Sequence, residues 1–301
     1  MDELDGVGKT IASDAEGRDR LRSMATGKDD LDSQATIVGG DERADSFSVG
    51  SIFAERYKIA SEGKAGGMGV VYQCLDLKLG EEATALKVIH PRLVRSEEAL
   101  KRFRQEVSIS RKLTHDGIVR VHDIGTHAGM EYFTMEWVEG MSLRDVIDQR
   151  KAKGEPFSLE EACRIIDSLA AALQHAHRFT IHRDIKPENI MVEDGDFSRL
   201  KLMDFGIAKM LTVSQFTTTS LQMGTPYYMA PEQKLDTGHV DKRADIYSVG
   251  VVLFELLTLE NTVGPELPSE LNPKLPKEVD DVFRRAVALK PERRYQDALE
   301  L

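Results

Sequence analysis

Three short apolar segments follow residue 56, at residues 57–59, 70–75 and 85–89. They are rich in Val, Ile, Leu and Tyr, and a cluster of glycines lies between the first and the second. Short segments of this composition, bounded by glycine, are typical of β-strands joined by turns. The pattern therefore predicts a small β-sheet at the start of the folded region.

A helix is predicted directly after these strands. Ser96 precedes two acidic residues, as is common at a helix N-terminus. Leu100, Phe103 and Val107 then recur at the spacing of one helical face. We expect this helix to pack its apolar face against the sheet.

Helical patterns dominate the second half of the chain. Ser158 and Glu161 have the spacing of a capping box, in which each residue binds the other's backbone amide at the start of a helix. Another long helix is predicted over residues 244–257. The fold class is therefore α+β, with a sheet-containing part followed by a mainly helical part. The predicted apolar face after Ser158 consists of Ala162, Ile165, Ile166, Leu169, Leu173 and Ala176.

The first 49 residues differ from the rest of the chain. They are rich in Asp, Ser, Gly and Thr, and Phe47 is their one aromatic residue. Such a segment buries too little apolar surface to offset the entropy lost on ordering. We expect a mostly disordered acidic tail over residues 1–49 and a folded domain over residues 50–301.

Composition narrows the class of protein. At 301 residues, 41% of them hydrophobic, the chain can build a sizeable core. A net charge of −11 argues against binding nucleic acid through phosphate neutralisation. Cys74 and Cys163 are far apart and have no neighbours typical of a metal site, which favours a reducing, cytoplasmic location. The longest apolar run, residues 249–257, is much shorter than the roughly 20 residues of a membrane span.

Polar residues whose side chains could take part in a reaction gather between residues 181 and 206. The chain reads His-Arg-Asp-Ile-Lys-Pro-Glu-Asn from His182 to Asn189, and Asp-Phe-Gly follows from Asp204. Asn189 and Asp204 offer the oxygen ligands that Mg²⁺ prefers, while Asp184 is placed to accept a hydroxyl proton. Lys186 can reach a transferred phosphate as a point charge. The ordered set indicates phosphoryl transfer, in which catalysis is mostly positioning and charge neutralisation.

From about Gly50 to Leu301 the chain resembles the bacterial eukaryotic-like (Hanks-type) serine/threonine protein kinases. The resemblance implies a bilobal fold, with an antiparallel sheet and one main helix in an N-lobe at residues 50–138 and a mainly helical C-lobe at residues 139–301. By the same resemblance the chain stops early in the last helix of the C-lobe. The resemblance also implies that ATP is the phosphate donor, with Mg²⁺ or Mn²⁺, and that Ser/Thr hydroxyls of proteins are the acceptors. Neither a nucleic-acid partner nor a membrane segment is expected in this chain.

The family's N-lobe anchors have counterparts here. Lys87 matches the strand lysine that binds the α- and β-phosphates, and Glu106 matches the helix glutamate that pairs with it. Lys64 stands where the family has its first loop glycine, and we expect it to weaken ATP binding modestly. Met135 takes the gatekeeper position. The remaining residues assigned to nucleotide are the loop Gly66, Gly67, Met68 and Gly69, together with Val71, Ala85 and the hinge backbone at Glu136 and Val138.

The resemblance also assigns regulatory and substrate-handling residues. Thr225 is expected to contact Asp184 and to help hold the substrate hydroxyl. Thr217 and Thr219 are the expected sites of activating autophosphorylation, which self-association of two copies would allow in trans. A phosphate there would neutralise Arg183 and order the loop.

Further residues are expected to serve as structural supports. Arg294 matches the family's partner for Glu232, and Asp245 matches the acid that holds the backbone of the catalytic loop. Between residues 258 and 291 four prolines indicate that the helix which helps to dock substrates is reduced.

Two alternatives remain open from the sequence. A pseudokinase or nucleotide-binding signalling scaffold is favoured by Lys64 and by the short segment at residues 258–291. A small-molecule phosphotransferase of the same fold is disfavoured by residues 225–232, which match a peptide-binding segment. Against a scaffold, all five residues of the nucleotide and catalytic site are present: Lys87, Glu106, Asp184, Asn189 and Asp204.

Overall fold

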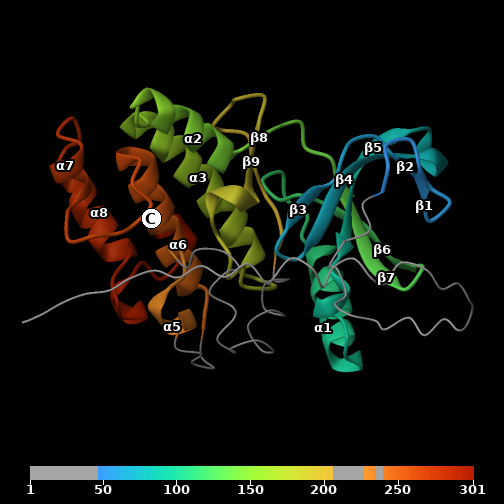
Figure 1. Ribbon diagram of the computed structural model, residues 1–301. Helices are drawn as coiled ribbons and strands as arrows, with labels where there is room; N and C mark the ends of the chain where they lie inside the picture. The colour runs from blue at the N-terminus through green and yellow to red at the C-terminus, as the bar shows by residue number, and fades with distance from the viewer. Residues whose placement is uncertain (1–46, 206–226, 235–239) are drawn as a thin grey trace, which may run out of the picture. The chain divides into compact units, whose positions relative to one another are not determined.

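The computed structural model describes residues 47–205, 227–234 and 240–301 (Figure 1). Within these residues the N-terminal part forms a seven-stranded antiparallel sheet in the order β1-β2-β4-β5-β7-β6, and β3 pairs with β4. The three predicted strands are confirmed as β2, β4 and β5. The strands are β1 (Ile52–Phe53), β2 (Tyr57–Ile59), β3 (Lys64–Gly66), β4 (Gly69–Asp76), β5 (Glu82–Ile89), β6 (Val121–His127) and β7 (Met130–Glu136).

Each face of this sheet carries its own apolar cluster. Because side chains alternate along a strand, Leu86 and Val88 of β5 belong to one cluster, whereas Ala85 and Ile89 belong to the other. Lys87 lies two residues from both Ala85 and Ile89, so its side chain is on the same face of the sheet as theirs. The sequence of β5 therefore places this lysine on the face that helix α1 covers.

Helix α1 (Glu97–Ser110) begins as predicted, because the Ser96 side chain accepts a hydrogen bond from the backbone N–H of Ala99. Phe103 and Val107 are fully buried against the sheet, and the Phe103 ring lies 6.3 Å from that of Phe133 in β7. This packing fixes α1 beside β5 and β7 and brings its C-terminal end towards the residues that follow β10.

The C-terminal part is mainly helical, with a small sheet of order β10-β9-β8. The predicted capping box between Ser158 and Glu161 is present at the start of α3, and almost every side chain of α6 is buried. Its elements are β8 (Gly140–Ser142), α2 (Leu143–Lys153), α3 (Leu159–Ala176), β9 (Ile190–Glu193), β10 (Leu200–Leu202), α5 (Pro231–Lys234), α6 (Arg243–Thr258), α7 (Pro268–Leu271) and α8 (Glu278–Ala286).

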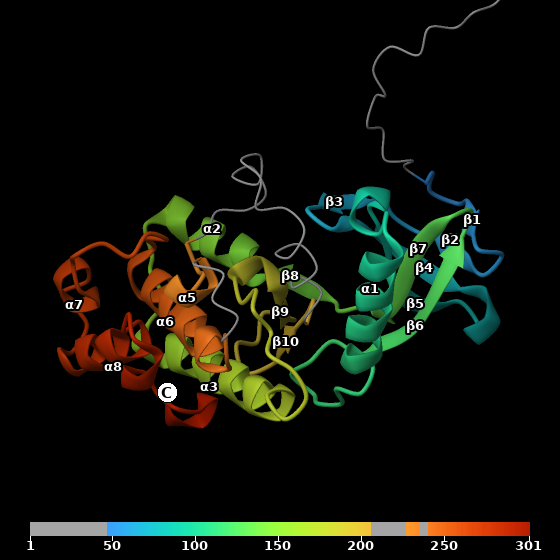
Figure 2. The same cartoon turned by 90° about the horizontal axis from the view of Figure 1, so that it is seen from below.

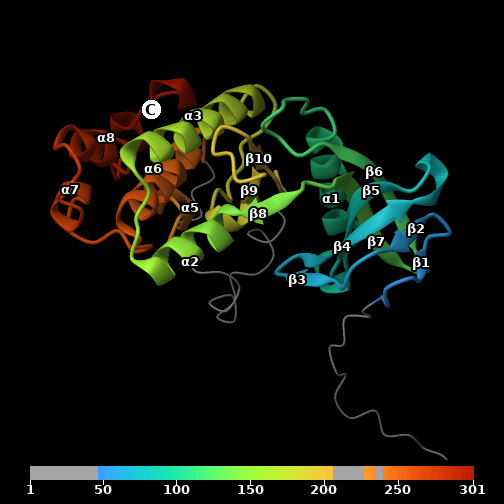
Figure 3. The ribbon, with the colours of Figure 1, turned by 90° about the horizontal axis from the view of Figure 1, so that it is seen from above.

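The small sheet lies between the larger sheet and the helices, as seen from below in Figure 2 and from above in Figure 3. Backbone hydrogen bonds tie β10 to the segment that leads into β6. Leu202 N–H donates to the Gly117 carbonyl at 2.9 Å, and Val119 N–H donates to the Leu202 carbonyl at 3.0 Å. The strand that precedes Asp204 is therefore attached to both lobes.

Residues 258–291 follow the sequence prediction in part. Helix α7 is only four residues long and begins at Pro268, which confirms that this helix is reduced. Helix α8 was not predicted; it buries Val279, Phe283 and Ala286. In the part of the chain described, no helix combines the length and apolar character needed to cross a membrane.

Candidate active site

Three of the predicted site residues meet in the loop before β9. The Asp184 Oδ2 atom accepts a hydrogen bond from Lys186 Nζ at 2.8 Å and another from Asn189 Nδ2 at 2.9 Å. Asn189 Nδ2 also donates to the Asp184 carbonyl at 2.8 Å. The side chains of Lys186 and Asp184 remain 32% and 30% exposed, so the carboxylate is held in place and still accessible.

Two buried residues hold this loop from behind. Asp245, at the start of α6, accepts the backbone N–H groups of His182 at 2.9 Å and Arg183 at 2.7 Å. His182 binds the backbone N–H of Asp184 through Nδ1 and the Met203 carbonyl through Nε2. Asp245 therefore fulfils the supporting role expected of it, and His182 connects the loop to the segment that contains Asp204.

Asp204 lies across from β5 and forms an ion pair with Lys87. Its Oδ1 atom is 2.6 Å from Lys87 Nζ, and the two side chains are only 13% and 6% exposed. The expected pair between Lys87 and Glu106 is not among the contacts of the described residues; Glu106 is half-buried on α1 and has an interaction of its own. A buried ammonium requires an anion, and in this structure Asp204 supplies it.

Asp204 and Arg183 both have left-handed backbone conformations, with φ values of 64° and 67°. Non-glycine residues adopt this region at a cost, and such strain concentrates at functional sites. The conformation aims consecutive side chains in different directions. Asp204 reaches Lys87, while the next residue, Phe205, packs its ring 4.5 Å from His182.

The predicted adenine-binding residues belong to one apolar cluster. Ala85, Met135 and Val138 are buried in it, and Val71 and Met68 pack against it. Within the described residues neither main-chain polar group of Val138 has a hydrogen-bond partner, which suits a backbone that binds the edge of a base. The cluster and this backbone together fit adenine.

The glycine loop forms a tight hairpin between β3 and β4. Gly66 pairs with Gly69, and Gly67 and Met68 make the turn. Gly69 lies so close to β5 that a Cβ atom would be 2.0 Å from the Val88 carbonyl oxygen. The Met68 carbonyl accepts the N–H of the residue after β5 at 3.0 Å, which fixes the tip of the loop over the β5 end. Lys64, the departure from the family pattern, is exposed in β3 and pairs with Val71.

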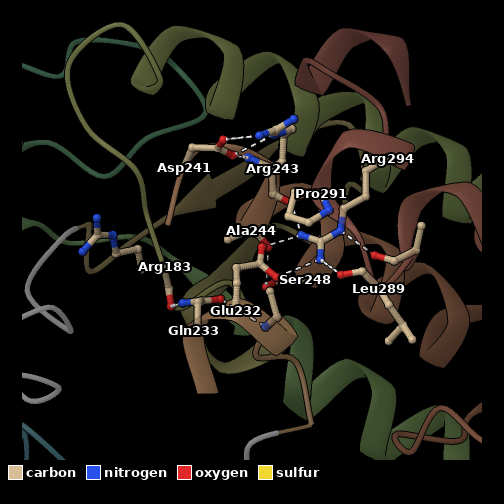
Figure 4. Close-up of polar contacts among 12 residues, drawn as sticks. Arg183, Glu232, Gln233, Asp241, Arg243, Ala244, Ser248, Leu289, Pro291 and Arg294 are labelled. Atoms are coloured by element: carbon tan, nitrogen blue, oxygen red, sulfur yellow. Dashed lines mark hydrogen bonds and ion pairs between the residues drawn. The ribbon is translucent and has the colours of Figure 1, made fainter. Parts of the chain in front are cut away.

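Glu232 forms the expected ion pair with Arg294, as Figure 4 shows. The two N···O distances are 2.6 and 2.8 Å, and the Arg294 side chain is fully buried. Next to this pair, Gln233 accepts from the backbone N–H of Ala230 and donates to the Arg183 carbonyl at 2.9 Å. The segment after residue 226 is thus attached to the catalytic loop.

This arrangement has counterparts in known proteins. Residues 57–294 match the family model described as "Protein kinase domain". The chain belongs to the protein kinase family. The predicted α+β kinase fold is confirmed by a crystal structure of the Mycobacterium tuberculosis PknI kinase domain, which is 29% identical with a TM-score of 0.69 and covers 84% of this chain and 96% of that one.

Two relatives of this chain are bacterial proteins named as serine/threonine-protein kinases, as the resemblance predicted. A probable kinase PknB of Lactococcus lactis is 35% identical over 271 residues, which cover 85% of this chain and 42% of the relative. PrkC of Bacillus subtilis is 35% identical over 269 residues, with 84% and 40% covered. This chain thus spans about two fifths of the length of these relatives.

Some predicted site residues of this chain are not described by the structure, and some residues at the site were not predicted. Thr217, Thr219 and Thr225 lie outside the described residues. Met191 of β9, which packs against the adenine cluster, was missed, although its place two residues after Asn189 in an apolar strand could have indicated it. Gln233 was missed because a glutamine after a helix start carries no distinctive sequence signal.

Proposed function

We propose that this domain transfers the γ-phosphoryl group of ATP to Ser or Thr hydroxyls of proteins. The observation that carries the proposal is the geometry of Asp184, whose Oδ2 atom is fixed by Lys186 and Asn189 while the carboxylate stays partly exposed. Among the described residues Asp184 Oδ1 has no hydrogen-bond partner. It is therefore the atom offered to a substrate hydroxyl.

The proposed reaction joins the substrate oxygen to the γ-phosphorus and breaks the bond from that phosphorus to the β–γ bridging oxygen, so ADP leaves. Asp184 Oδ1 accepts the hydroxyl proton. Lys186 lies beside this carboxylate and would stabilise the charge on the transferred group as a point charge. Because Lys87 is in β5 beside the adenine cluster, it would hold the α- and β-phosphates.

The residues present fit a magnesium ion held in part by nucleotide. Asn189 donates with its amide nitrogen, which leaves its Oδ1 atom available, and Asp204 engages Lys87 through one carboxylate oxygen only. Mg²⁺ commonly takes one or two protein oxygens and completes its shell with phosphates and water. When bound, the ion would neutralise phosphate charge, and Mn²⁺ prefers similar ligands.

Transfer of radiolabel from [γ-³²P]ATP to the protein itself and to a generic Ser/Thr protein substrate tests this proposal. We expect incorporation that requires Mg²⁺ or Mn²⁺ and falls at least about 100-fold in Asp184→Asn and Lys87→Met. Thermal melting of each variant establishes that it is folded. If the folded wild-type chain transferred no label with either metal, the proposal would be wrong and a nucleotide-binding scaffold would be favoured.

We also propose that the kinase activates itself by phosphorylating Thr217 and Thr219 through transient self-association. Support comes from Arg183, whose guanidinium points away from the polar network in Figure 4 and has no partner among the described residues. A nearby phosphate would supply the missing anion. Phosphopeptide mapping against the Asp184→Asn variant tests this, and a loop that is unmodified in the active wild type would contradict it.

Use of ATP would place the domain in the cytoplasm.

A further inference from the structure

The side chain of Glu136 joins three segments at the end of β7. Its Oε1 atom is 2.5 Å from Lys201 Nζ of β10, and its Oε2 atom accepts the backbone N–H of Arg120 at 3.2 Å. The backbone N–H of Glu136 in turn donates to the Arg120 carbonyl at 2.8 Å. The Glu136 carboxylate thus connects the end of β7, the segment that leads into β6, and β10.

The ion pair is partly shielded from solvent. The Lys201 side chain is 15% exposed and that of Glu136 is 30% exposed. A second acid, Glu193 of β9, lies 3.9 Å from the same ammonium. A partly buried ion pair is screened less by salt than a fully exposed one.

Both ends of this pair lead to the nucleotide site. Glu136 is followed by Trp137 and then by Val138, whose main-chain groups are offered to adenine in the proposed function. Lys201 lies three residues before Asp204, the proposed metal ligand, and β10 is bonded by its backbone to residues 117 and 119. The pair therefore spans the distance between the base-binding and metal-binding parts of the site.

We propose that Lys201 and the Glu136 carboxylate are positioning residues for the nucleotide. By attaching the hinge to β10, they hold the Val138 main chain in the orientation that binds adenine before ATP arrives. Such preorganisation lowers the cost of binding and has little effect on the transfer step. This inference rests on the proposed function, because it assumes that the hinge binds the base of ATP.

Equilibrium binding of a fluorescent ATP analogue, combined with steady-state kinetics, tests the inference. We expect Lys201→Met, which keeps the apolar part of the side chain, to raise both the Kd of the analogue and the KM for ATP three- to tenfold. The kcat value should change less than twofold. Glu136→Gln, which is isosteric, should have the same effect.

Arg199→Met is the matched control. Arg199 lies two residues before Lys201 and pairs with Glu193 and Asp194, but its side chain is 55% exposed and does not contact the hinge. We expect its Kd and KM to match the wild type. Equal nucleotide affinity in wild type and folded Lys201→Met, or a change confined to kcat, would overturn the inference. A wild-type chain that bound no nucleotide would instead refute the proposed function.

Discussion

Gly69 occupies a position where the backbones of two strands approach closely. It pairs with Ile89 across β4 and β5, and a Cβ atom there would lie 2.0 Å from the Val88 carbonyl oxygen and 2.9 Å from the carbonyl carbon. Backbone atoms within a sheet cannot move aside as the end of a flexible side chain can. By contrast, a Cβ atom on Gly66 would meet nothing closer than the Gly69 carbonyl oxygen at 3.7 Å.

We predict that Gly69→Ala destabilises the protein and Gly66→Ala does not. Overpacking of this kind costs about 1–3 kcal/mol, which corresponds to a fall in Tm of roughly 2–12 °C for a domain of this size. Gly66→Ala should change Tm by less than about 2 °C. Differential scanning calorimetry of the two variants measures this, and equal Tm values would show that β4 and β5 are further apart than the structure indicates.

At the scale of single residues, the sequence predicted a site but not all of its contacts. It predicted Lys87, Asp184, Asn189 and Asp204 as members of the site, which stays a proposal, and it predicted Glu106 as the partner of the lysine. The choice of anion could not be predicted, since Lys87 and Asp204 are 117 residues apart and meet only when both lobes are folded. Local patterns carry no information about such a distance.

Helix α6 contains a charge in the middle of its apolar surface. Glu255 is 1% exposed, and Arg144 of α2 binds both its carboxylate oxygens at 2.9 and 3.0 Å. The Tyr228 hydroxyl donates to the same carboxylate. Burial, together with the neighbouring Glu255 anion, raises the pKa of Tyr228 above its usual range, so the hydroxyl keeps its proton. Arg144 neutralises the charge of Glu255, and the neutral Tyr228 hydroxyl adds a hydrogen bond to the same carboxylate.

We predict that Arg144→Met lowers the free energy of unfolding by about 3–5 kcal/mol, because it leaves the Glu255 carboxylate buried without its cation. The double variant Arg144→Met with Glu255→Met should recover much of this loss. Arg150→Met on the same helix is the control, since its pair with Glu161 is 28% and 27% exposed and its loss should cost less than about 1 kcal/mol. Urea unfolding measures all three. A double variant less stable than Arg144→Met would contradict this account.

At the scale of elements, capping signals and apolar spacing agreed on α1 and α3, and apolar pattern alone predicted α6. Ser96 and Ser158 marked the starts of α1 and α3, and both caps are present in the structure. Helix α8 was missed because nearby prolines indicated a loop, although Pro276 lies just before the helix, where proline is tolerated. The small sheet β8-β9-β10 was also missed, since strands of three or four residues have too few positions to establish a period.

At the scale of the whole molecule, Phe47 belongs to the folded domain. We assigned residues 1–49 to a tail, and the position of that boundary stays a prediction. In the structure the Phe47 ring lies 4.9 Å from Phe53 and 5.6 Å from Tyr72, and its backbone N–H donates to the Tyr72 hydroxyl at 3.3 Å. The sequence could not show that Phe47 packs on the domain, because a single aromatic residue forms no repeating pattern of apolar positions.

Two N-terminal deletions therefore differ in their expected effect on stability. Removal of residues 1–43 should leave Tm within about 2 °C of the full chain, because Phe47 keeps its contacts with Phe53 and Tyr72. Removal of residues 1–49 also removes this ring. Partial burial of a Phe side chain contributes about 1–2 kcal/mol, so Tm should fall by roughly 2–8 °C. Phe47→Ala in the full chain should reproduce that fall, which separates the loss of the ring from the loss of the tail. Equal Tm values for the two deletions would place the start of the folded domain after Phe47.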